Sequence, residues 1–403
     1  MRQGWQTMRL DEVCSFINGR AYSKEELLQT GKYPVLRVGN FFTNNHWYFS
    51  DLELDDDKYC DNGDLLYAWS ASFGPRIWTG SKVIFHYHIW KVIPKFDKIT
   101  KDFLFHLLAW DTEEIKSAYG TGATMMHVGK GSIENRIVAV PTLAEQHCIV
   151  AILDEAFASI SKAKAIAEQN LKNARELFES YLQMVFEVRG DSWCNKLLKD
   201  IALDFGRGKS KHRPRNWNGL FGGNYPFIQT GEVRNANKYL SEYTQTYNEV
   251  GLAQSKLWGK GTICITIAAN IAETAILGFD ACFPDSIIGL QVNPIKANLD
   301  FTFYLLQYFK AELQRLGKGS AQDNINLGTF ENQFFPFPTV KEQQSIVFKI
   351  DALRAETQKL EAIYKQKINY LEELKKSILQ KAFAGELPIS DLVEPNTGKI
   401  KTL

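Results

Sequence analysis

Two long segments of the chain carry apolar residues at helical spacing. In the segment from Thr339 to Phe383, apolar side chains recur alternately four and three residues apart, a spacing typical of the contact face of a coiled coil. Only Thr357 and Lys367 interrupt this face. Thr339 and Glu342 have the T-x-x-E spacing of a capping box, in which each side chain caps the backbone amide of the other residue. The pattern therefore predicts one long helix that begins at Thr339.

The same pattern occurs 197 residues earlier, from Thr142 to Phe186, with Thr142 and Glu145 as the capping box. The first helix carries alanines at several positions where the second carries Leu or Tyr, so the two could approach closely as an antiparallel pair. In such a pair, Asn170 and Lys367 would disfavour slipped registers. The alternative is two separate amphipathic helices, each lying on its own domain. The predicted contact face includes Ile149, Leu153, Ile160, Leu177, Ile346, Ile350, Leu353, Leu360, Leu371 and Leu374.

The duplication extends beyond the helices. Residues 120–154 align without a gap on residues 317–351 with 12 of 35 identical, which is enough to identify an internal repeat. Upstream of these segments, several matching residues serve as anchors of the repeat. The anchors are further apart in the second copy, which therefore contains extra residues, some of them near the basic loop at 207–215. These anchors pair Trp5 with Trp193, Tyr33-Pro34 with Tyr225-Pro226, Gly63 with Gly261, and Asp102-Phe103 with Asp300-Phe301.

Between the long helices, short β-rich runs alternate with helical patterns. Strands are predicted at Tyr33–Val38, Asp64–Trp69, Lys82–Phe85, His88–Ile93, Thr262–Ala268 and Ile287–Val292, and helices at Phe103–Trp110 and Phe301–Leu313. We therefore expect an α+β protein with a pseudo-twofold repeat, in which two mixed α/β domains are separated by an antiparallel coiled coil. The predicted segments are residues 1–140, 141–188, 189–337, 338–385 and a polar tail at 386–403.

The composition is that of a globular protein. The 403 residues are 45% hydrophobic and 13% aromatic, which suffices for about two or three packed domains. No apolar run approaches the roughly 20 residues needed to span a bilayer, and the first residues lack the apolar core of a signal peptide, so we expect a cytoplasmic protein. The six cysteines have no C-x-x-C spacing, which argues against zinc ribbons and suggests ordinary buried thiols.

Charge points to one local patch. The net charge of +1 gives no overall attraction to nucleic acid, but the loop from Arg207 to Arg215 has five Lys or Arg in nine positions and no acid. Lys209, Lys211, Arg213 and Arg215 in this loop are therefore candidates for phosphate contact.

The chain lacks the motifs of catalysis. Gly208-Lys209-Ser210 resembles the end of a P-loop, but Leu203 occupies the position that requires glycine. There is no Pro-Pro dipeptide for an amino-methyltransferase motif, and no metal-dependent nuclease motif follows Pro284-Asp285. His86 and His88 could share a strand face but have no third metal ligand nearby, and Ser70 and Ser72 lack a G-x-S-x-G motif. We therefore predict no catalytic residues, no cofactor and no metal.

Several motifs together resemble the specificity subunits of type I restriction-modification systems. They are the duplicated P-T-x-x-E-Q start of a long helix, YPVLRVGN at Tyr33, GDLLYAWSASFG at Gly63 and LQKAFAGEL near the end. The resemblance covers residues 1–390. It implies two target recognition domains that each read one half of a split double-stranded DNA target, and helices that set the gap and bind two methyltransferase subunits. Methylation would belong to the methyltransferase subunits, and ATP-dependent cleavage would belong to restriction/translocase subunits.

Helix length is compatible with this resemblance. Ile149 to Phe186 is 38 residues, about 57 Å at about 1.5 Å per residue, so a helix pair could hold two readers at least one turn of DNA apart. The alternative is a helical scaffold that binds proteins without reading DNA, although the basic loop favours DNA. Besides the basic loop, the candidates for contacts to base edges are Arg20, Arg37, Trp69, Ser70, Arg76, Asn270, Gln322 and Asn324. Arg76 could instead only cap a turn, and Trp69 could be part of the core.

Overall fold

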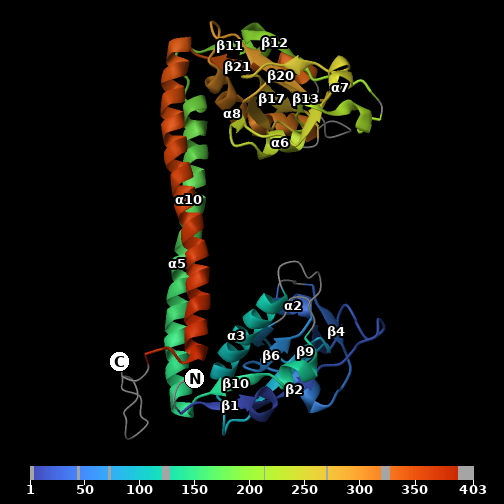
Figure 1. Ribbon diagram of the computed structural model, residues 1–403, viewed down its shortest axis with the longest axis vertical. Helices are drawn as coiled ribbons and strands as arrows, with labels where there is room; N and C mark the ends of the chain where they lie inside the picture. Colours follow the sequence, from blue (N-terminus) through green and yellow to red (C-terminus); the bar gives the residue numbers. More distant parts are fainter. Residues whose placement is uncertain are drawn as a thin grey trace. The chain divides into compact units, whose positions relative to one another are not determined.

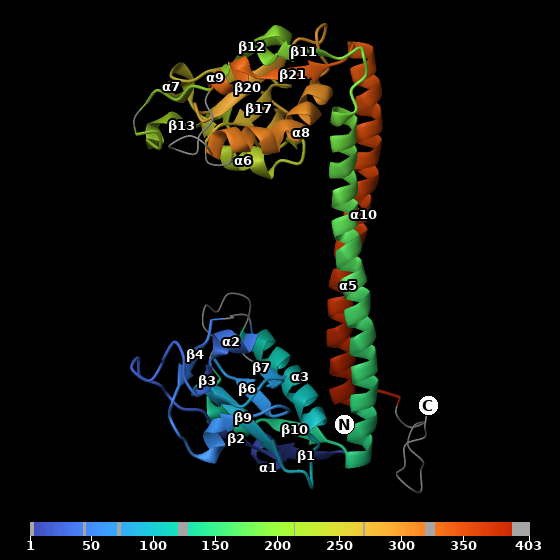
Figure 2. The same ribbon diagram turned by 180° about the vertical axis from the view of Figure 1, so that it is seen from behind.

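The computed structural model describes residues 4–42, 46–70, 74–119, 128–212, 214–268, 271–318 and 327–388. Contacts divide the chain into two compact units, Met1–Glu168 with Lys365–Leu403, and Gln169–Tyr364. Each unit contains one mixed α/β domain and a part of both long helices (Figures 1 and 2). In the described part of the chain, no helix combines the length and apolar character that crossing a membrane requires.

The two long helices begin and end within one residue of the predicted bounds. They are α5 (Leu143–Glu187) and α10 (Val340–Ala384). Thr142 Oγ1 accepts a hydrogen bond from Glu145 N at 3.3 Å, and Glu145 Oε2 accepts one from Thr142 N at 3.4 Å, so the predicted capping box is complete in α5.

At the start of α10 only one half of the predicted capping box forms. Thr339 Oγ1 accepts from Glu342 N at 3.3 Å. The Glu342 carboxylate instead accepts from Ser192 Oγ at 2.6 Å and from Trp193 Nε1 at 3.2 Å. The second helix therefore uses its capping glutamate to hold the chain that enters the second domain.

Within each unit the segments of α5 and α10 run antiparallel, as the sequence predicted. In the first unit, Lys164 Nζ lies 2.6 Å from Glu372 Oε1. In the second unit, Arg175 Nε lies 3.0 Å from Glu361 Oε2. Two cation–ring contacts between the helices also show that residue numbers rise along α5 as they fall along α10. Lys375 of α10 lies 5.0 Å from the ring centroid of Phe157 in α5, and Arg354 of α10 lies 5.6 Å from that of Phe178 in α5.

The packed stripe of the helices differs in part from the predicted face. Buried positions recur every seven residues at Leu153, Ile160, Ala167 and Ala174 in α5, and α10 buries Ile350 and Thr357. Leu177, Leu360 and Leu374 are instead 51%, 37% and 47% exposed, which corrects the prediction at these three positions. Near its end α5 packs on the second domain, where the Phe178 ring lies 6.3 Å from that of Tyr304, so Phe178 is partly buried there and Leu177 is not. Of the remaining predicted positions, Ile149 is buried and Ile346, Leu353 and Leu371 are partly buried.

Thr357 was predicted to interrupt the contact face but is 3% exposed. Its hydroxyl donates to Leu353 O at 3.0 Å and lies 3.1 Å from Arg354 O, so the polar group is satisfied by its own helix. Lys367 is exposed and Asn170 is partly buried.

The first domain contains two four-stranded sheets and a two-stranded one. Their strand orders are β2-β9-β6-β7, β4-β3-β8-β5 and β1-β10. The strands are β1 (Gln6–Arg9), β2 (Cys14–Asn18), β3 (Tyr33–Leu36), β4 (Tyr48–Ser50), β5 (Tyr59–Cys60), β6 (Leu65–Ala68), β7 (Gly74–Ile77), β8 (Val83–Phe85), β9 (Ile89–Pro94) and β10 (Ile137–Val140). The helices are α1 (Leu10–Val13), α2 (Val38–Phe42), η1 (Asp56–Lys58), α3 (Lys101–Tyr119) and α4 (Lys130–Glu134).

The second domain repeats this topology strand for strand. Its sheets have the orders β12-β20-β17-β18-β14, β15-β13-β19-β16 and β11-β21, so β14 is an addition at one edge. The strands are β11 (Cys194–Leu197), β12 (Ala202–Arg207), β13 (Phe221–Phe227), β14 (Tyr239–Leu240), β15 (Gln245–Tyr247), β16 (Leu257–Trp258), β17 (Ile263–Thr266), β18 (Thr274–Leu277), β19 (Ala281–Cys282), β20 (Ile287–Val292) and β21 (Phe334–Phe337). The helices are η2 (Leu198–Ile201), η3 (Asn218–Leu220), α6 (Thr230–Asn235), α7 (Glu249–Ala253), α8 (Leu299–Lys318) and α9 (Leu327–Asn332).

The predicted strands and helices are present, with shorter bounds for several strands. The strand predicted at Tyr33–Val38 ends at Leu36, because α2 begins at Val38. The strand predicted from His88 begins at Ile89, so His86 and His88 lie in a turn rather than on one strand face. Each predicted short helix is longer than expected, as α3 and α8 show.

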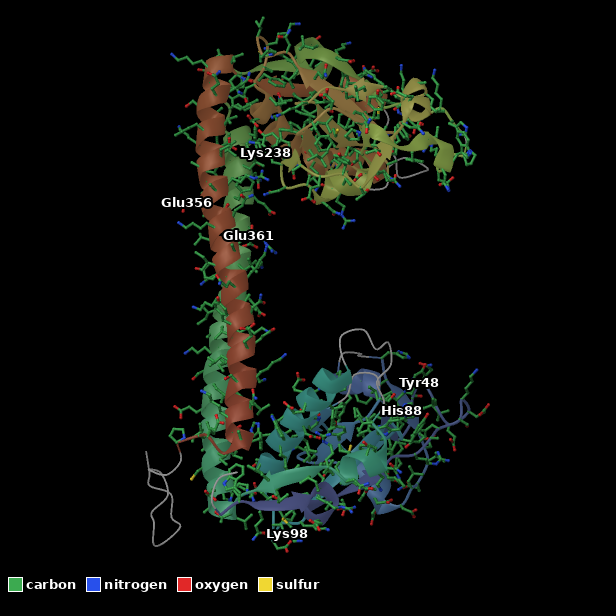
Figure 3. All side chains as sticks on the ribbon, in the orientation of Figure 1. Tyr48, His88, Lys98, Lys238, Glu356 and Glu361 are labelled. Carbon is green, nitrogen blue, oxygen red and sulfur yellow. The ribbon has the colours of Figure 1, made fainter. Side chains whose placement is uncertain are left out.

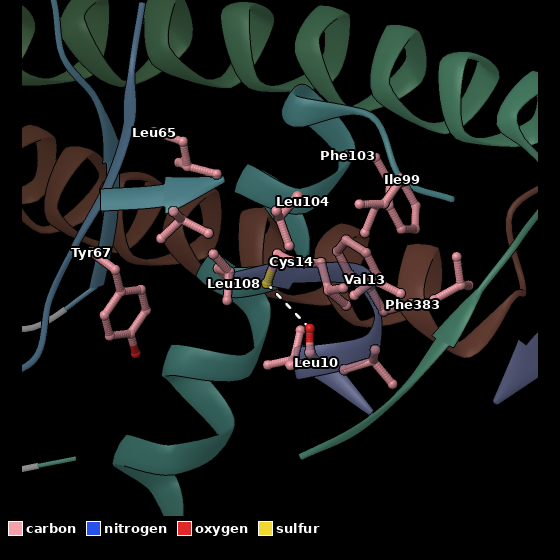
Figure 4. Packing of buried hydrophobic residues seen from close by; sticks show 14 of the residues in the cluster. Leu10, Val13, Cys14, Leu65, Tyr67, Ile99, Phe103, Leu104, Leu108 and Phe383 are labelled. Atoms are coloured by element: carbon pink, nitrogen blue, oxygen red, sulfur yellow. Dashed lines mark hydrogen bonds between the residues drawn. The ribbon is translucent and has the colours of Figure 1, made fainter. Parts of the chain in front are cut away.

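Each domain has its own apolar core, which extends onto the long helices. In the first domain, Phe103 and Leu104 of α3 pack with Leu10 and Val13 of α1 and with Phe383 of α10 (Figure 4). In Figures 1 and 2, α3 and α8 each lie between the strands of their own domain and the long helices. Five cysteines are buried as predicted, and Cys194 is exposed. Burial raises the pKa of the Cys14 thiol to about 12, and its Sγ lies 3.3 Å from Leu10 O.

The glutamine of the repeated P-T-x-x-E-Q motif joins each long helix to its domain. Gln146 and Gln343 are both completely buried. Gln146 Nε2 donates to Pro141 O at 2.9 Å, and its Oε1 accepts from Thr100 N at 2.7 Å. In the second copy, Gln343 Nε2 donates to Pro338 O at 2.8 Å, and Gln343 Oε1 accepts from Asn298 N at 2.7 Å. The motif thus fixes the start of the helix to the loop that precedes α3 or α8.

This arrangement gives a stability prediction. Replacing Gln343 with Leu leaves Pro338 O and Asn298 N without these partners, and we expect it to lower the free energy of unfolding by about 1 to 3 kcal/mol. Urea unfolding of the full chain measures this. Gln344→Leu, at the exposed neighbouring position, is the control and should change stability by less than about 0.5 kcal/mol. Equal stability of the two variants would show that the buried amide does not hold the helix start.

A second repeated contact joins each domain to its helix through an equivalent aspartate. Asp154 Oδ1 lies 2.9 Å from His106 Nε2 in the first unit. Asp351 Oδ1 accepts from Lys238 Nζ at 2.9 Å in the second, and Lys238 points from its domain toward α10 (Figure 3). The carboxylate is therefore duplicated, while its partners differ between the copies.

Candidate nucleic-acid interface

One glycine in each domain brings two loops together. Gly19 follows β2 and Gly208 follows β12. An added Cβ would lie 2.4 Å from Phe85 O at Gly19, and 2.3 Å from Phe283 O at Gly208, so any larger residue would separate the loops. The residues that follow, Arg20 and Lys209, are thereby placed beside the turns at 86–88 and 284–286.

In the first domain, this turn is rich in aromatic and imidazole rings. Trp69 Nε1 donates to Tyr87 O at 2.7 Å, and the Trp69 ring lies 4.9 Å from that of His88. Tyr87 is 38% exposed. Burial, together with the nearby charges of His88 and Arg37, lowers the pKa of His86 to about 4, so His86 is neutral near pH 7. Tyr48 and His88 lie on the side of this domain away from the long helices (Figure 3).

The candidates predicted from the sequence differ in their surroundings in the first domain. Arg20 is held by Glu26, with its two terminal nitrogens 3.0 and 2.7 Å from the carboxylate oxygens. Arg76 donates to Phe41 O, so it holds α2 to β7. Ser70 is 7% exposed, and Trp69 is partly buried, with its ring stacked 5.8 Å from that of Trp90.

Arg37 and Arg76 are both exposed, but in the described part of the chain the Arg37 guanidinium, unlike that of Arg76, has no hydrogen-bond or ion-pair partner. The Arg37 guanidinium carbon lies 5.3 Å from the Tyr48 ring centroid, a cation–π distance. The candidate with the freest access to a ligand in this domain is therefore Arg37.

In the second domain, the basic loop has a fixed backbone and exposed lysines. Gln254 Oε1 accepts from Lys211 N at 2.6 Å and from His212 N at 3.0 Å, and Ser255 Oγ donates to Lys209 O at 2.8 Å. Lys209 and Lys211 are exposed. Among the residues that the structure describes, no carboxylate forms an ion pair with either lysine. These two side chains therefore offer positive charge to solvent.

Arg215 is differently placed. One terminal nitrogen lies 2.7 and 2.8 Å from the two carboxylate oxygens of Asp285, whose backbone oxygen accepts from Arg207 Nε at 2.8 Å. Part of the positive charge of the loop is therefore balanced by the turn beside it.

A polar hollow of about 540 Å³ opens next to this loop. Two amides meet in it, where Gln229 Nε2 donates to Gln245 Oε1 at 2.7 Å. Its lining comes from the basic loop, η3, the turn at 284–286, strands β13 and β15 and the start of α6. It comprises Ser210, Arg215, Asn216, Asn218, Phe221, Phe227, Gln229, Thr230, Gln245, Pro284 and Ser286.

Not all candidates can be placed, and some lining residues were not predicted. Arg213, Asn270, Gln322 and Asn324 lie outside the described residues, as does the tail beyond residue 388.

Sequence reasoning missed Tyr48, Gln229 and Gln245. The anchor that pairs Tyr33-Pro34 with Tyr225-Pro226 contained a signal for Gln229, because four residues beyond each Tyr it aligns Arg37 with Gln229.

A duplicated mixed α/β domain, with the same group of loops in each copy and with long antiparallel helices, defines the class of protein. A family model described as the type I restriction modification DNA specificity domain matches residues 2–169 and 191–372. The chain therefore belongs to the family of type I restriction-modification DNA specificity proteins, as the resemblance implied.

Curated relatives agree with this assignment. The chain is 21% identical to the EcoBI specificity subunit of Escherichia coli, over 96% of this chain and 87% of that protein. It is 26% identical to the MjaVIII specificity subunit of Methanocaldococcus jannaschii, over 97% and 94%. Both relatives are named specificity subunits of type I restriction enzymes, which confirms the prediction of a non-catalytic specificity subunit.

Solved structures share the fold. A chain from a structure of complex assembly and conformational transition in the type I R-M system is similar with a TM-score of 0.77 at 19% identity, covering 96% of this chain and 99% of that one. The HsdS subunit of Thermoanaerobacter tengcongensis is similar with a TM-score of 0.57 at 18% identity, covering 96% and 98%.

Proposed function

We propose that this specificity subunit reads a bipartite double-stranded DNA target, one half with each mixed α/β domain, at residues 1–140 and 189–337. The reading surface of each domain is the group of loops around Gly19 or Gly208. Helices α5 and α10 set the unread gap between the two halves. Two modification (methyltransferase) subunits, and restriction/translocase subunits in the full complex, supply the chemistry in the cytoplasm.

One observation carries this proposal: the two domains repeat the same loops in the same strand register but fill them with different side chains. The turn is His86-Tyr87-His88 in one domain and Pro284-Asp285-Ser286 in the other. The loop after the glycine is basic only in the second. A reader of two different half-sites requires a constant scaffold with variable contacts, and this is the pattern of the repeat.

Equivalent exposed apolar residues support docking of the same partner to both copies. Ile137 is 62% exposed, and Phe334, 197 residues later, is 57% exposed. The turns after β9 and β20 expose Phe96 by 68% and Ile295 by 86%. Exposed apolar residues at equivalent places in both copies are suited to two identical modification subunits, because each copy can then present one docking site.

The exposed lysines of the basic loop test the DNA proposal. Replacing Lys209 and Lys211 with Ala should weaken binding to all DNA sequences, because phosphate contacts carry no base information. The slope of log K against log salt concentration should become less steep by about 2, one for each lost contact. Filter binding at several salt concentrations, with the modification complex assembled, measures both effects.

The control for this test replaces Lys349 and Lys359, two exposed lysines of α10, with Ala. It should leave the salt dependence unchanged. A helical scaffold that binds only proteins would show the same weak DNA affinity for wild type and both variants. That result would favour the scaffold alternative over the DNA reader.

A further inference from the structure

Strand pairing identifies one pair of equivalent positions on the two reading surfaces. In the first domain, β3 pairs with β4 so that Val35 lies opposite Tyr48. In the second, β13 pairs with β15 so that Phe227 lies opposite Gln245. Tyr48 and Gln245 are therefore equivalent. Two residues beyond Val35 and Phe227, the chain reaches Arg37 and Gln229, which are equivalent in turn.

The two members of each pair are in contact, but the contact is chemically different. The guanidinium carbon of Arg37 lies 5.3 Å from the Tyr48 ring centroid. Gln229 Nε2 donates to Gln245 Oε1 at 2.7 Å. The backbone thus brings the same two positions together in both domains, once as a cation on an aromatic ring and once as two amides.

Both pairs stand on a rigid base. Arg37 follows Leu36, which is fully buried and whose carbonyl accepts from His86 N at 2.9 Å. Gln229 follows Ile228, also fully buried. Glu232 bridges the second pair, because its carboxylate accepts from Gln229 N at 2.8 Å and from Thr244 N at 2.9 Å. A base of this kind positions side chains for recognition.

The pairs themselves are open to a ligand. Arg37, Gln229 and Gln245 are exposed, and the two glutamines line the polar hollow beside the basic loop. A side chain on a buried strand end whose polar group is exposed, as in the second domain beside the exposed lysines of the basic loop, is well placed to reach a base edge.

We propose that these two positions determine one base in each half-site: Arg37 on Tyr48 selects guanine, and the Gln229–Gln245 pair selects adenine. This rests on the proposed function. Guanine offers two acceptors in the major groove, N7 and O6, which match the fork of an arginine whose face, but not whose N–H groups, is occupied by a ring. Adenine offers one acceptor and one donor, N7 and N6–H₂.

The amide pair matches adenine for a simple reason. One N–H and one carbonyl are used between the two glutamines, so a donor group and an acceptor remain for the ligand. This holds whichever way the amides are oriented, because reversing both exchanges the two roles. The pair therefore presents a free carbonyl beside a free N–H₂ group, which is the complement of an adenine edge.

The test exchanges the pairs between the domains. Arg37→Gln combined with Tyr48→Gln places the amide pair of the second domain in the first. Methylated motifs from cells that carry this variant should show guanine replaced by adenine at one position of one half-site, with the other half-site unchanged. Arg37→Lys keeps the charge but loses the fork, and should reduce discrimination at the same position by about 10- to 100-fold. Gln229→Ala should likewise reduce discrimination at one adenine position of the other half-site.

The controls are Arg9→Lys on β1 and Gln344→Ala on α10, which are exposed and distant in the topology from the reading loops. Both should leave the motif unchanged, and thermal melting verifies that every variant folds. A bipartite motif that is identical in wild type and in the folded Arg37 and Gln229 variants would overturn this inference while leaving the proposed function intact. Uniform weakening on all sequences would also overturn it, because phosphate contact would then be the role of these side chains.

Discussion

Replacing residues 1–140 with the corresponding segment of another specificity subunit is expected to change one half of the DNA target completely and to leave the other half as it was. Each domain has its own core, its own sheets and its own group of loops around Gly19 or Gly208. One set of contacts between each domain and its helices comes from the P-T-x-x-E-Q motif, which both copies contain. The methylated motif of cells that carry the chimera measures the result.

The reciprocal chimera, with residues 189–337 exchanged, is the matched control and should change the opposite half-site. Both chimeras are compared with a parent in which the same junctions are cut and rejoined without exchange. A folded chimera whose motif changes in both halves would contradict independent reading by the two domains, and so would one whose motif changes in neither.

Lengthening both long helices by seven residues is expected to widen the unread gap by about three base pairs. Seven residues add about 10 Å at about 1.5 Å each, and DNA rises by about 3.4 Å per base pair. Insertion after Ala167 and after Tyr364 uses equivalent positions of the repeat, and a seven-residue step keeps the buried heptad positions in phase. The gap in the methylated motif gives the result, which would be smaller if the DNA bends to compensate.

Inserting four residues after Ala167 alone is the contrasting variant. It rotates the rest of α5 by about 40° and moves it by about 6 Å, so buried positions such as Ala174 lose their partners and stability should fall. If the doubly extended protein is folded and active but the gap keeps its original length, the helices do not set the spacing.

The long helices could be predicted closely because their signals are local. The threonine cap, the glutamate three residues later and the apolar spacing fixed both starts within one residue. The detail of the packed stripe could not be predicted, because the burial of Phe178 rather than Leu177 depends on the second domain, whose Tyr304 packs against it. The burial of Thr357 depends on a hydrogen bond to its own helix, which the apolar pattern does not contain.

The proposed reading surface was less predictable than the fold. Charge alone revealed Lys209 and Lys211, but Arg20 and Arg215 belong to ion pairs whose partners, Glu26 and Asp285, approach only in the folded chain. Gln245 was missed because it meets Gln229 through strand register. That register requires knowing that β15 pairs with β13, although α6 and β14 lie between these two strands in the sequence.

The most direct test of the central claim compares the methylated DNA of cells with and without this chain. A bipartite motif, two short specified segments separated by an unread gap of fixed length, should be present with the chain and vanish when it is deleted. Restoring the chain should restore the same motif. A methylated motif that persists unchanged without the chain, or one that is continuous rather than split, would contradict a subunit that reads DNA with two domains.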